Sequence, residues 1–298
     1  MSAVRSIARH EVTGLRRERL PKVLLILFVV MVMLSSFIGW LASTTVTSVW
    51  RESVRVGLTT APNPFADMSP LYFSRNTVIY VVLIGALAAI VLGAMSGMRD
   101  RRARVTDLIL TRPVSGREFL AGKALGLGAV LAGITTLVSM IAWVTLAVIA
   151  GPLGWGATLR LLAFFALVLV VLQTFALLGL LSGLRSREQT GALLLPISIW
   201  ALITFVLPQL STGANPVSLL NPVPAPPATD GAFAVLHAVL GPLSLTEQFK
   251  TVSGLLLANP DVIGSASLAV AVLGFALLLV TGALFATPRT ALRTVFHD

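Results

Sequence analysis

The stretch Leu161–Ser182 reads LLAFFALVLVVLQTFALLGLLS and decides the fold class of this chain. It contains no Asp, Glu, Lys, Arg or His, and at about 1.5 Å per helical residue it is long enough to cross ~30 Å of hydrocarbon. Five further stretches share these two properties: residues 23–42, 77–98, 124–150, 191–210 and 265–286. The sequence therefore predicts an all-α membrane protein with six transmembrane helices.

The overall composition supports the same conclusion. Charged residues make up 11% of the 298 residues, and the mean hydropathy is +0.92. A soluble globular protein carries about 25% charged residues, so this chain has too little charge to cover a water-facing surface. The chain has no Cys, which excludes disulfides and thiolate chemistry, and its three His residues lie far apart in the sequence. We therefore expect no metal site and no cofactor bound by this chain.

The Lys and Arg residues are distributed unevenly between the two sides of the membrane. Six spans place both termini on one side, and if that side is the cytoplasm, seventeen of the 22 basic residues face inward. This bias follows the positive-inside rule and predicts a multi-pass protein with both termini cytoplasmic. The net charge of +10 then lies on the inner face, where anionic lipid attracts it. Topology accounts for the charge, and we expect no nucleic-acid binding.

Residues 1–21 are expected to form a cytoplasmic amphipathic elbow helix before the first span. One helical face carries the apolar residues Val4, Ile7, Ala8, Val12 and Leu15. Such a helix lies in the inner membrane interface, and Pro21 is expected to end it. The alternative is an unstructured basic tail. Residues 22–298 then form the six-span transmembrane domain, in which the outer segment 43–76 is polar and shows little pattern.

The inner segment 99–123 carries the most informative pattern in the chain. Pro113 disfavours a helix at Arg112 and so separates two helical pieces. Ser115 and Glu118 have the spacing of a capping box, which predicts a helix start that continues into the third span. The pattern indicates a short helix, a sharp corner and a helix joined rigidly to a membrane span. A cytosolic partner that pushes on the short helix would move that span.

The extracytoplasmic segment 211–264 precedes the last span. It contains two short apolar stretches, Gly231–Leu240 and Leu245–Leu257, which are split by a Gly-Pro pair. Ser244 and Glu247 have capping-box spacing at the start of the second stretch. Because both stretches are too short to cross a membrane, they predict an outer helical hairpin that is re-entrant or interfacial.

No constellation of side chains in the sequence indicates catalysis. Gly116–Lys123 resembles a phosphate-binding loop only faintly, because five residues rather than four separate its glycines and Ala124 replaces the Ser or Thr needed for magnesium. The spans contain no carboxylate, which argues against a proton-driven transporter. Their main polar groups include Gln173, Thr174 and Thr204, which either bond neighbouring helices or touch a substrate.

Small residues repeat every four positions in two of the spans. One row lies in the second span and a second row begins at the third span: Gly85, Ala89, Gly93 and Gly97, then Gly122 and Gly126. Rows of this kind permit helix backbones to approach closely. They serve either packing within one chain or an interface between subunits.

The inner segment resembles the first cytoplasmic loop of ABC-2 type permeases. That family shows a Ser-x-Pro-Val-Ser-Arg-x-Glu pattern and a Gly-Lys pair before the third span, which this chain matches with Thr111–Ser115, Arg117-Glu118 and Gly122-Lys123. At the usual Gly-Thr position of the family, the chain has Arg104-Val105. The layout of elbow helix, six spans and outer hairpin extends the resemblance over nearly the whole chain. Its long outer segment is similar to that of the permeases that include the nitrous-oxide reductase maturation permease.

The resemblance implies a membrane subunit with no enzymatic activity of its own. ATP and Mg would bind to a separate ABC ATP-binding subunit, and a second permease copy or paralogue would complete the assembly in the plasma (inner) membrane of a prokaryote. The implied ATPase-coupling interface consists of Asp107, Leu108, Leu110, Thr111, Arg112, Pro113, Arg117, Glu118, Arg185, Arg187 and Glu188. Gln173, Thr174 and Thr204 are the candidates for a translocation pathway.

Two functions are consistent with this resemblance. The first is export of a substrate across the plasma membrane, driven by ATP that the partner subunit hydrolyses. The alternative is force transmission, in which the chain acts on an extracytoplasmic protein during metalloenzyme maturation without moving a solute. Because apolar spans suit many kinds of cargo, the sequence does not specify the substrate.

Overall fold

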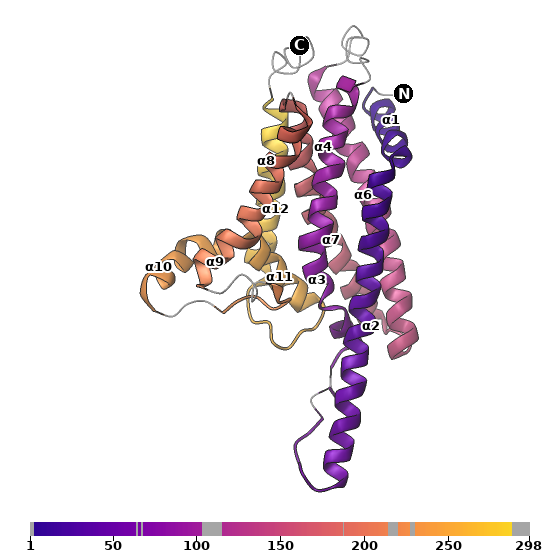
Figure 1. Ribbon diagram of the computed structural model, residues 1–298, viewed down its shortest axis with the longest axis vertical. Helices are drawn as coiled ribbons and strands as arrows, with labels where there is room; N and C mark the ends of the chain where they lie inside the picture. The colour runs from indigo at the N-terminus through magenta and orange to yellow at the C-terminus, as the bar shows by residue number, and fades with distance from the viewer. Residues whose placement is uncertain are drawn as a thin grey trace.

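The computed structural model describes residues 3–63, 65–66, 68–102, 115–186, 188–213, 220–226 and 230–287. Within these residues the regular structure is helical, with no strand. Six helical segments are long and apolar enough to cross a membrane: Leu25–Arg55, Pro70–Arg99, Gly116–Ala150, Trp155–Arg185, Gln189–Thr212 and Ala266–Phe285. They form one bundle (Figure 1), which confirms the predicted all-α membrane fold with six transmembrane helices.

The N-terminal residues form the expected elbow helix, α1 (Ala3–Arg17), which is followed by α2 (Arg19–Arg55). The corner between these helices is at Glu18, whose backbone is extended with φ −76° and ψ 144°. The prediction that Pro21 ends the elbow helix is wrong, because Pro21 lies in the first turn of α2. Proline fits there because the amides of a first helical turn have no intrahelical acceptor.

Helix α2 is much longer than its charge-free stretch. Its 37 residues correspond to about 55 Å, and the part from Ser43 to Arg55 projects beyond the bundle (Figure 1). The sequence shows little pattern here because hydroxyl and charged residues are mixed irregularly with exposed apolar ones such as Val46, Val49 and Val54. Four of the hydroxyl groups in this part of α2 donate hydrogen bonds to carbonyl oxygens of the same helix, as Ser53 Oγ does to Val49 O at 2.9 Å. The helix ends just before Gly57, which has a left-handed φ of +73°.

Helix α7 (Trp155–Arg185) lies at the centre of the bundle. The most apolar window of this span is 61% buried, against 22% for the first span and 17% for the last. Its main neighbour is the second span, which consists of η1 (Pro70–Ser74), α3 (Thr77–Tyr80), the π-helical turn η2 (Val81–Gly85) and α4 (Ala86–Arg102). The remaining membrane helices pack around this central pair.

The glycine rows are used for packing within the chain. Gly126 of α6 (Gly116–Ala150) lies against the backbone of Ala8, and α1 packs its apolar face on α6. Gly93 of α4 lies against Ala176 of α7, and a Cβ at Gly93 would overlap the Ala176 carbonyl oxygen. Close contact between these helix backbones explains why the rows consist of small residues, and an interface with a second subunit is not needed to explain them.

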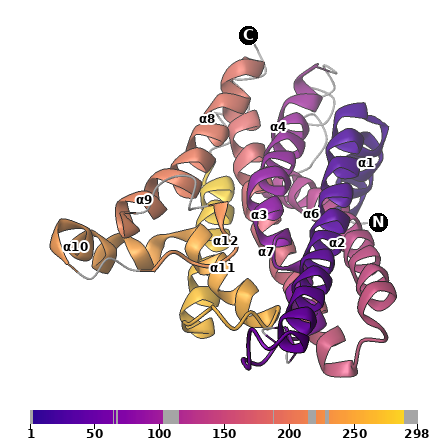
Figure 2. The same cartoon turned by 60° about the horizontal axis from the view of Figure 1, so that its bottom comes forward.

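The outer hairpin follows the fifth span, which consists of α8 (Gln189–Ala201), η3 (Leu202–Val206) and α9 (Leu207–Thr212). Its two helices are α10 (Gly231–Leu240) and α11 (Leu245–Leu256), joined by η5 (Gly241–Leu243). Helices α9 and α10 extend sideways from the bundle in both ribbon views (Figures 1 and 2). Helix α10 has no buried residue, whereas most of α11 is buried against the bundle.

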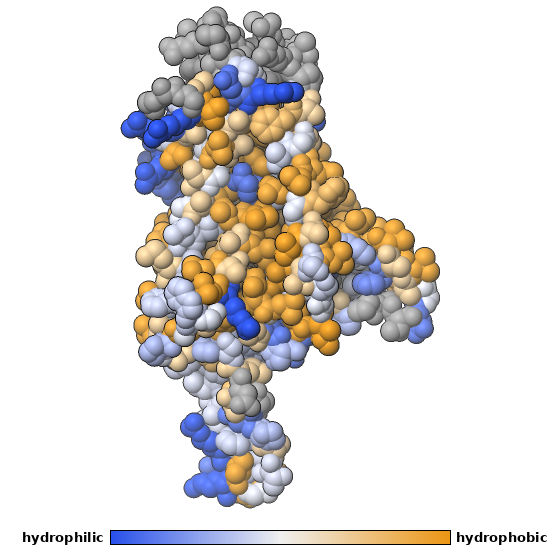
Figure 3. All heavy atoms as spheres, turned by 180° about the vertical axis from the view of Figure 1, so that it is seen from behind, coloured by the Kyte–Doolittle hydropathy of each residue, from blue (hydrophilic) through white to orange (hydrophobic). Residues whose placement is uncertain are grey.

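One end of the bundle, called here the inner end, carries α1, the end of α4, the start of α6, and the ends of α7 and α12 (Ala266–Phe285). Arg185 at the end of α7 donates hydrogen bonds to Ala283 O at 3.4 Å and to Thr287 Oγ1 at 3.2 Å. Figure 3 shows a broad apolar band over the bundle, with hydrophilic side chains gathered at the inner end and on the projecting part of α2.

Candidate functional site

The residues expected to contact an ATPase lie around the segment that connects α4 to α6. Asp107, Leu108, Leu110, Thr111, Arg112 and Pro113 lie outside the described residues, as does Arg187. The structure describes Arg117 and Glu118 in the first turn of α6, Arg185 at the end of α7, and Glu188 before α8. The described part of the site therefore consists of the helix ends that flank residues 103–114 and of the connection between α7 and α8.

The start of α6 has the predicted capping box. The Ser115 side-chain oxygen accepts a hydrogen bond from the Glu118 amide at 3.1 Å, and Glu118 Oε2 accepts one from the Ser115 amide at 2.8 Å. Helix α6 then continues without interruption from Gly116 to Ala150. The capping box therefore fixes the point at which residues 103–114 join a membrane helix, as the sequence predicts.

A buried ion pair lies one turn further along α6. Lys123 Nζ is 3.0 Å from Glu11 Oε2 of α1 and donates a hydrogen bond to the Ser96 carbonyl of α4 at 2.7 Å. The side chains of Lys123 and Glu11 are 1% and 2% exposed. The Lys123 ammonium also lies 5.5 Å from the centre of the Phe119 ring. A lysine this deeply buried is tolerated because carboxylate and carbonyl oxygens replace its lost water.

Arg99 extends the network to the corner between α1 and α2. Its Nη1 is 3.2 Å from Glu11 Oε1, and its Nε donates to Glu18 Oε1 at 3.3 Å. It also donates from Nη1 to the Glu11 carbonyl at 3.4 Å. Gly14 leaves the space that the guanidinium fills, since a Cβ there would collide with it. We call Glu11, Glu18, Arg99 and Lys123 the inner ion network.

The inner ion network joins α1 to both helices that flank residues 103–114. Arg99 lies near the end of α4, just before this segment, and Lys123 lies near the start of α6, just after it. The network therefore ties three helices together on both sides of this segment. Because Glu11 pairs with both cations, moving α1 away from α4 and α6 would leave buried charges without partners, which opposes separation of the helices.

Sequence reasoning missed the acidic partners in this network. The Gly122-Lys123 pair was recognised only as part of a family pattern, and no role was assigned to Glu11 or Glu18. The sequence does contain a signal, because Glu11 follows Ile7 by four residues and precedes Leu15 by four. That spacing places Glu11 on the buried face of α1, where a carboxylate requires a partner.

The second inner connection is described in part. The Arg185 side chain is exposed but bonds to α12, as given above, and so ties the inner ends of α7 and α12 together. Glu188 is exposed directly before α8 and makes no side-chain capping bond there. Both residues lie at the inner end of the bundle.

The three candidate pathway residues are in separate settings. Gln173 Nε2 donates to the Ala124 carbonyl of α6 at 3.3 Å, while Thr174 Oγ1 donates to Val170 O of its own helix at 2.9 Å. Thr204 is buried in η3, and its hydroxyl has no hydrogen-bond partner. Two of the three thus make the helix contacts that the packing alternative describes.

A second buried ion pair lies in α11, away from the inner end. Lys250 Nζ is 2.7 Å from Glu247 Oε1, and Glu247 Oε2 accepts a hydrogen bond from the Ala225 amide at 2.7 Å. The capping box predicted for Ser244 and Glu247 is therefore wrong. Glu247 turns toward Lys250 and Ala225, and the buried Ser244 hydroxyl makes no hydrogen bond.

Among the described residues, no group of three or more His, Asp or Glu could hold a metal ion. No curated protein matches the chain. A family model described as ABC-2 family transporter protein matches residues 5–286, from the elbow helix to the end of the sixth span. The chain therefore belongs to the ABC-2 transporter family.

Proposed function

We propose that this chain is the permease subunit of an ATP-driven exporter in the plasma membrane of a prokaryote. Family membership supports a membrane subunit of an ABC transporter. In the proposal, ATP and Mg bind to a separate ABC ATP-binding subunit, and this chain catalyses no reaction. The observation that carries the proposal is the inner ion network, because it ties α1 to both helices that flank residues 103–114.

Coupling begins where the ATP-binding subunit contacts residues 107–113, with both termini of the permease in the cytoplasm. Arg117 and Glu118 at the start of α6, together with Arg185 and Glu188, extend the contact surface. When the ATPase closes, it displaces the segment, and Arg99 and Lys123 carry the movement to α4, α6 and α1. Helix α4 passes it to α7, since their backbones touch and the two helices tilt as one body.

A second permease copy or a paralogue completes the pathway in this proposal. Broad apolar surfaces remain exposed on α2, α8 and α12. In the proposal, some of this surface contacts lipid and some contacts the second permease. Thr204 is the strongest of the three pathway candidates, because its buried hydroxyl lacks a partner. A small local rotation of η3 would present that hydroxyl to a passing substrate, whereas Gln173 and Thr174 would first have to break existing bonds.

The test is co-purification of the tagged chain from native membranes, followed by an ATPase assay. A stoichiometric ATP-binding subunit should accompany the wild-type chain. Deletion of residues 107–113, and the milder variant Asp107→Asn with Arg112→Gln, should abolish the coupling between ATPase activity and the permease. The matched control is Glu52→Gln with Arg55→Gln, which removes an exposed ion pair at the far end of α2. ATPase association and stimulation that survive the deletion unchanged would contradict the proposal.

Force transmission to an extracytoplasmic protein is the second candidate function. The observation that favours it is the continuation of α2 for about 20 Å beyond the bundle, since a lipid-spanning role does not require this length. Because the chain has no Cys, a single Val49→Cys variant reports on this region alone. ATP-dependent protection of that thiol in the presence of the partner, with no transported solute, would favour force transmission over export.

A further inference from the structure

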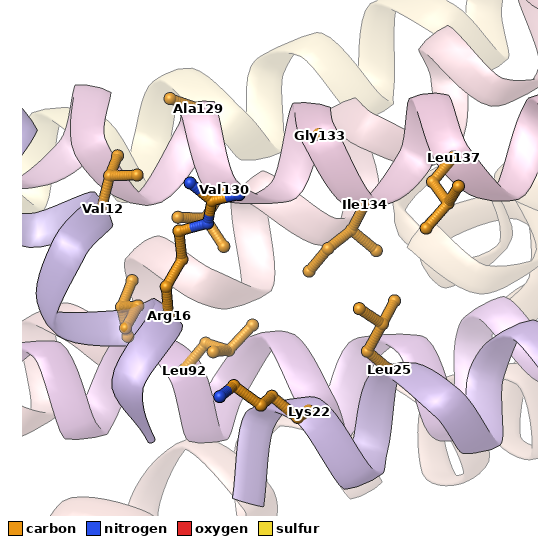
Figure 4. Close-up of a pocket in the computed structure, with 11 residues that line it drawn as sticks. Val12, Arg16, Lys22, Leu25, Leu92, Ala129, Val130, Gly133, Ile134 and Leu137 are labelled. Atoms are coloured by element: carbon orange, nitrogen blue, oxygen red, sulfur yellow. The ribbon is translucent and has the colours of Figure 1, made fainter. Parts of the chain in front are cut away.

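A groove of about 500 Å³ opens between α1, α2, α4 and α6 near the inner end. Its two ends differ in chemistry (Figure 4). Arg16 of α1 and Lys22 of α2 lie at one end, and Leu25, Ile134 and Leu137 line the other. Both α2 and α6 run away from the inner end in this region, so the apolar end lies deeper in the bundle than the basic end.

We propose that this groove binds one anionic phospholipid from the leaflet that faces α1. The phosphate of the headgroup lies between Arg16 and Lys22, and one acyl chain lies along α6 toward Leu137. The groove matches a phospholipid at both ends: its basic end suits the anionic headgroup, and its apolar end suits the hydrocarbon chain. The proposal requires only that the chain spans a membrane, and it is independent of the ATPase partner.

The two cations are available for an anion. Neither Arg16 nor Lys22 forms an ion pair with an acid in the part of the chain that the structure describes, and both side chains are exposed. The nearby carboxylate of Glu18 is engaged by Arg99. A phosphate at the membrane surface would therefore meet two cations that no described acid neutralises.

The α6 wall leaves room for an acyl chain. Ala129 and Gly133 are small and lie one turn apart, and a Cβ added at Gly133 would meet no atom within 4 Å. Leu92 closes the floor of the groove and is only 2% exposed. Hydrocarbon placed there would contact apolar side chains on three sides instead of leaving an open slot beside the helices.

A second copy of the chain fits this groove less well than a lipid. The inner end is basic, so another copy arranged symmetrically would bring its own Arg16 and Lys22 toward these cations or toward neighbouring arginines. Like charges repel at such an interface. A bound anionic lipid would instead bridge α1 and α2, and would hold the elbow helix beside the inner ion network.

The experiment measures lipid binding by native mass spectrometry of the purified chain, comparing phosphatidylglycerol with phosphatidylcholine of identical acyl chains. We expect one tightly held phosphatidylglycerol and a clear preference over phosphatidylcholine. Arg16→Gln with Lys22→Gln should weaken that binding by at least about tenfold, given the contribution of each cation near an anionic surface. The matched control, Arg5→Gln with Arg9→Gln, removes the same charge from exposed positions of α1 and should leave binding unchanged.

The apolar half of the site has its own test. Gly133→Phe should fill the groove and displace the acyl chain, whereas Gly274→Phe places the same side chain in open space on α12 and should not affect binding. Inorganic phosphate alone should not compete, because it lacks the chain that fills the groove. Equal binding of the two lipids, equal losses in the two Gln variants, or full binding by Gly133→Phe would each overturn the proposal. Disulfide formation between two copies carrying Gly133→Cys would also overturn it, since protein would then cover the groove.

Discussion

Two buried Lys–Glu pairs lie in different regions of this bundle and differ in what they connect. At the inner end, Glu11 and Lys123 are 112 residues apart and belong to different helices. In the outer hairpin, Glu247 and Lys250 are three residues apart on α11. The inner pair therefore resists separation of helices, whereas the outer pair shapes one helix and its contact with Ala225. The same chemistry serves assembly in one region and local anchoring in the other.

The largest expected effect comes from Lys123→Met. This change retains much of the apolar volume but removes the ammonium from the buried Glu11 carboxylate and from the Ser96 carbonyl. Because Arg99 remains beside Glu11, we expect a loss of roughly 3 kcal/mol of unfolding free energy, the lower end of the range for a broken buried ion pair. Denaturant unfolding of the purified chain in detergent micelles measures this loss. The double variant Glu11→Gln with Lys123→Met removes both charges and should recover a large part of the stability. If single and double variants are equally unstable, the pair does not hold the helices together.

A smaller effect is expected from Lys250→Met in the outer pair. The Glu247 carboxylate would keep its hydrogen bond from the Ala225 amide, and it is 10% exposed where Glu11 is only 2% exposed. We expect a loss of about 1–3 kcal/mol, the usual penalty for a buried polar group that loses one partner. The same unfolding measurement tests this, with co-purification of the ATPase as a second readout that should not change. A loss of unfolding free energy equal to that of Lys123→Met would show that the two ion pairs do not differ in their contribution to stability.

The membrane fold could be predicted from the sequence because it depends on local composition. A run without charged residues such as Leu161–Ser182 has few alternatives to a membrane helix, and the structure forms one over Trp155–Arg185. The far end of α2 was less predictable. Membrane spans are recognised by uninterrupted apolar residues, and in the extension Ser43–Arg55 hydroxyl and charged residues interrupt the apolar ones although the backbone is helical.

The candidate site could be predicted only in part, because its contacts join residues far apart in the chain. The Ser115 capping box is local and was recognisable from spacing alone. The choice of Lys123 as the partner of Glu11 depends on how α1 packs across α6, which no short pattern records. Arg99 reaches Glu18 only because Gly14 leaves space at the corner. Such pairings depend on tertiary packing, which the spacing of residues in the sequence does not specify.

The smallest effect distinguishes two serines that have the same sequence pattern. Ser115→Ala removes a capping bond to the Glu118 amide and should cost about 1 kcal/mol of unfolding free energy. Ser244→Ala removes a buried hydroxyl without a hydrogen bond and should be neutral or slightly stabilising. Both variants delete one oxygen from the residue before a helix, so each is the matched control for the other. Equal losses in unfolding measurements would mean that Ser244 caps α11 after all, and that Glu247 is shared between Lys250 and the helix start. A loss at Ser115 alone would show that capping-box spacing stabilises a helix only where no buried cation competes for the glutamate.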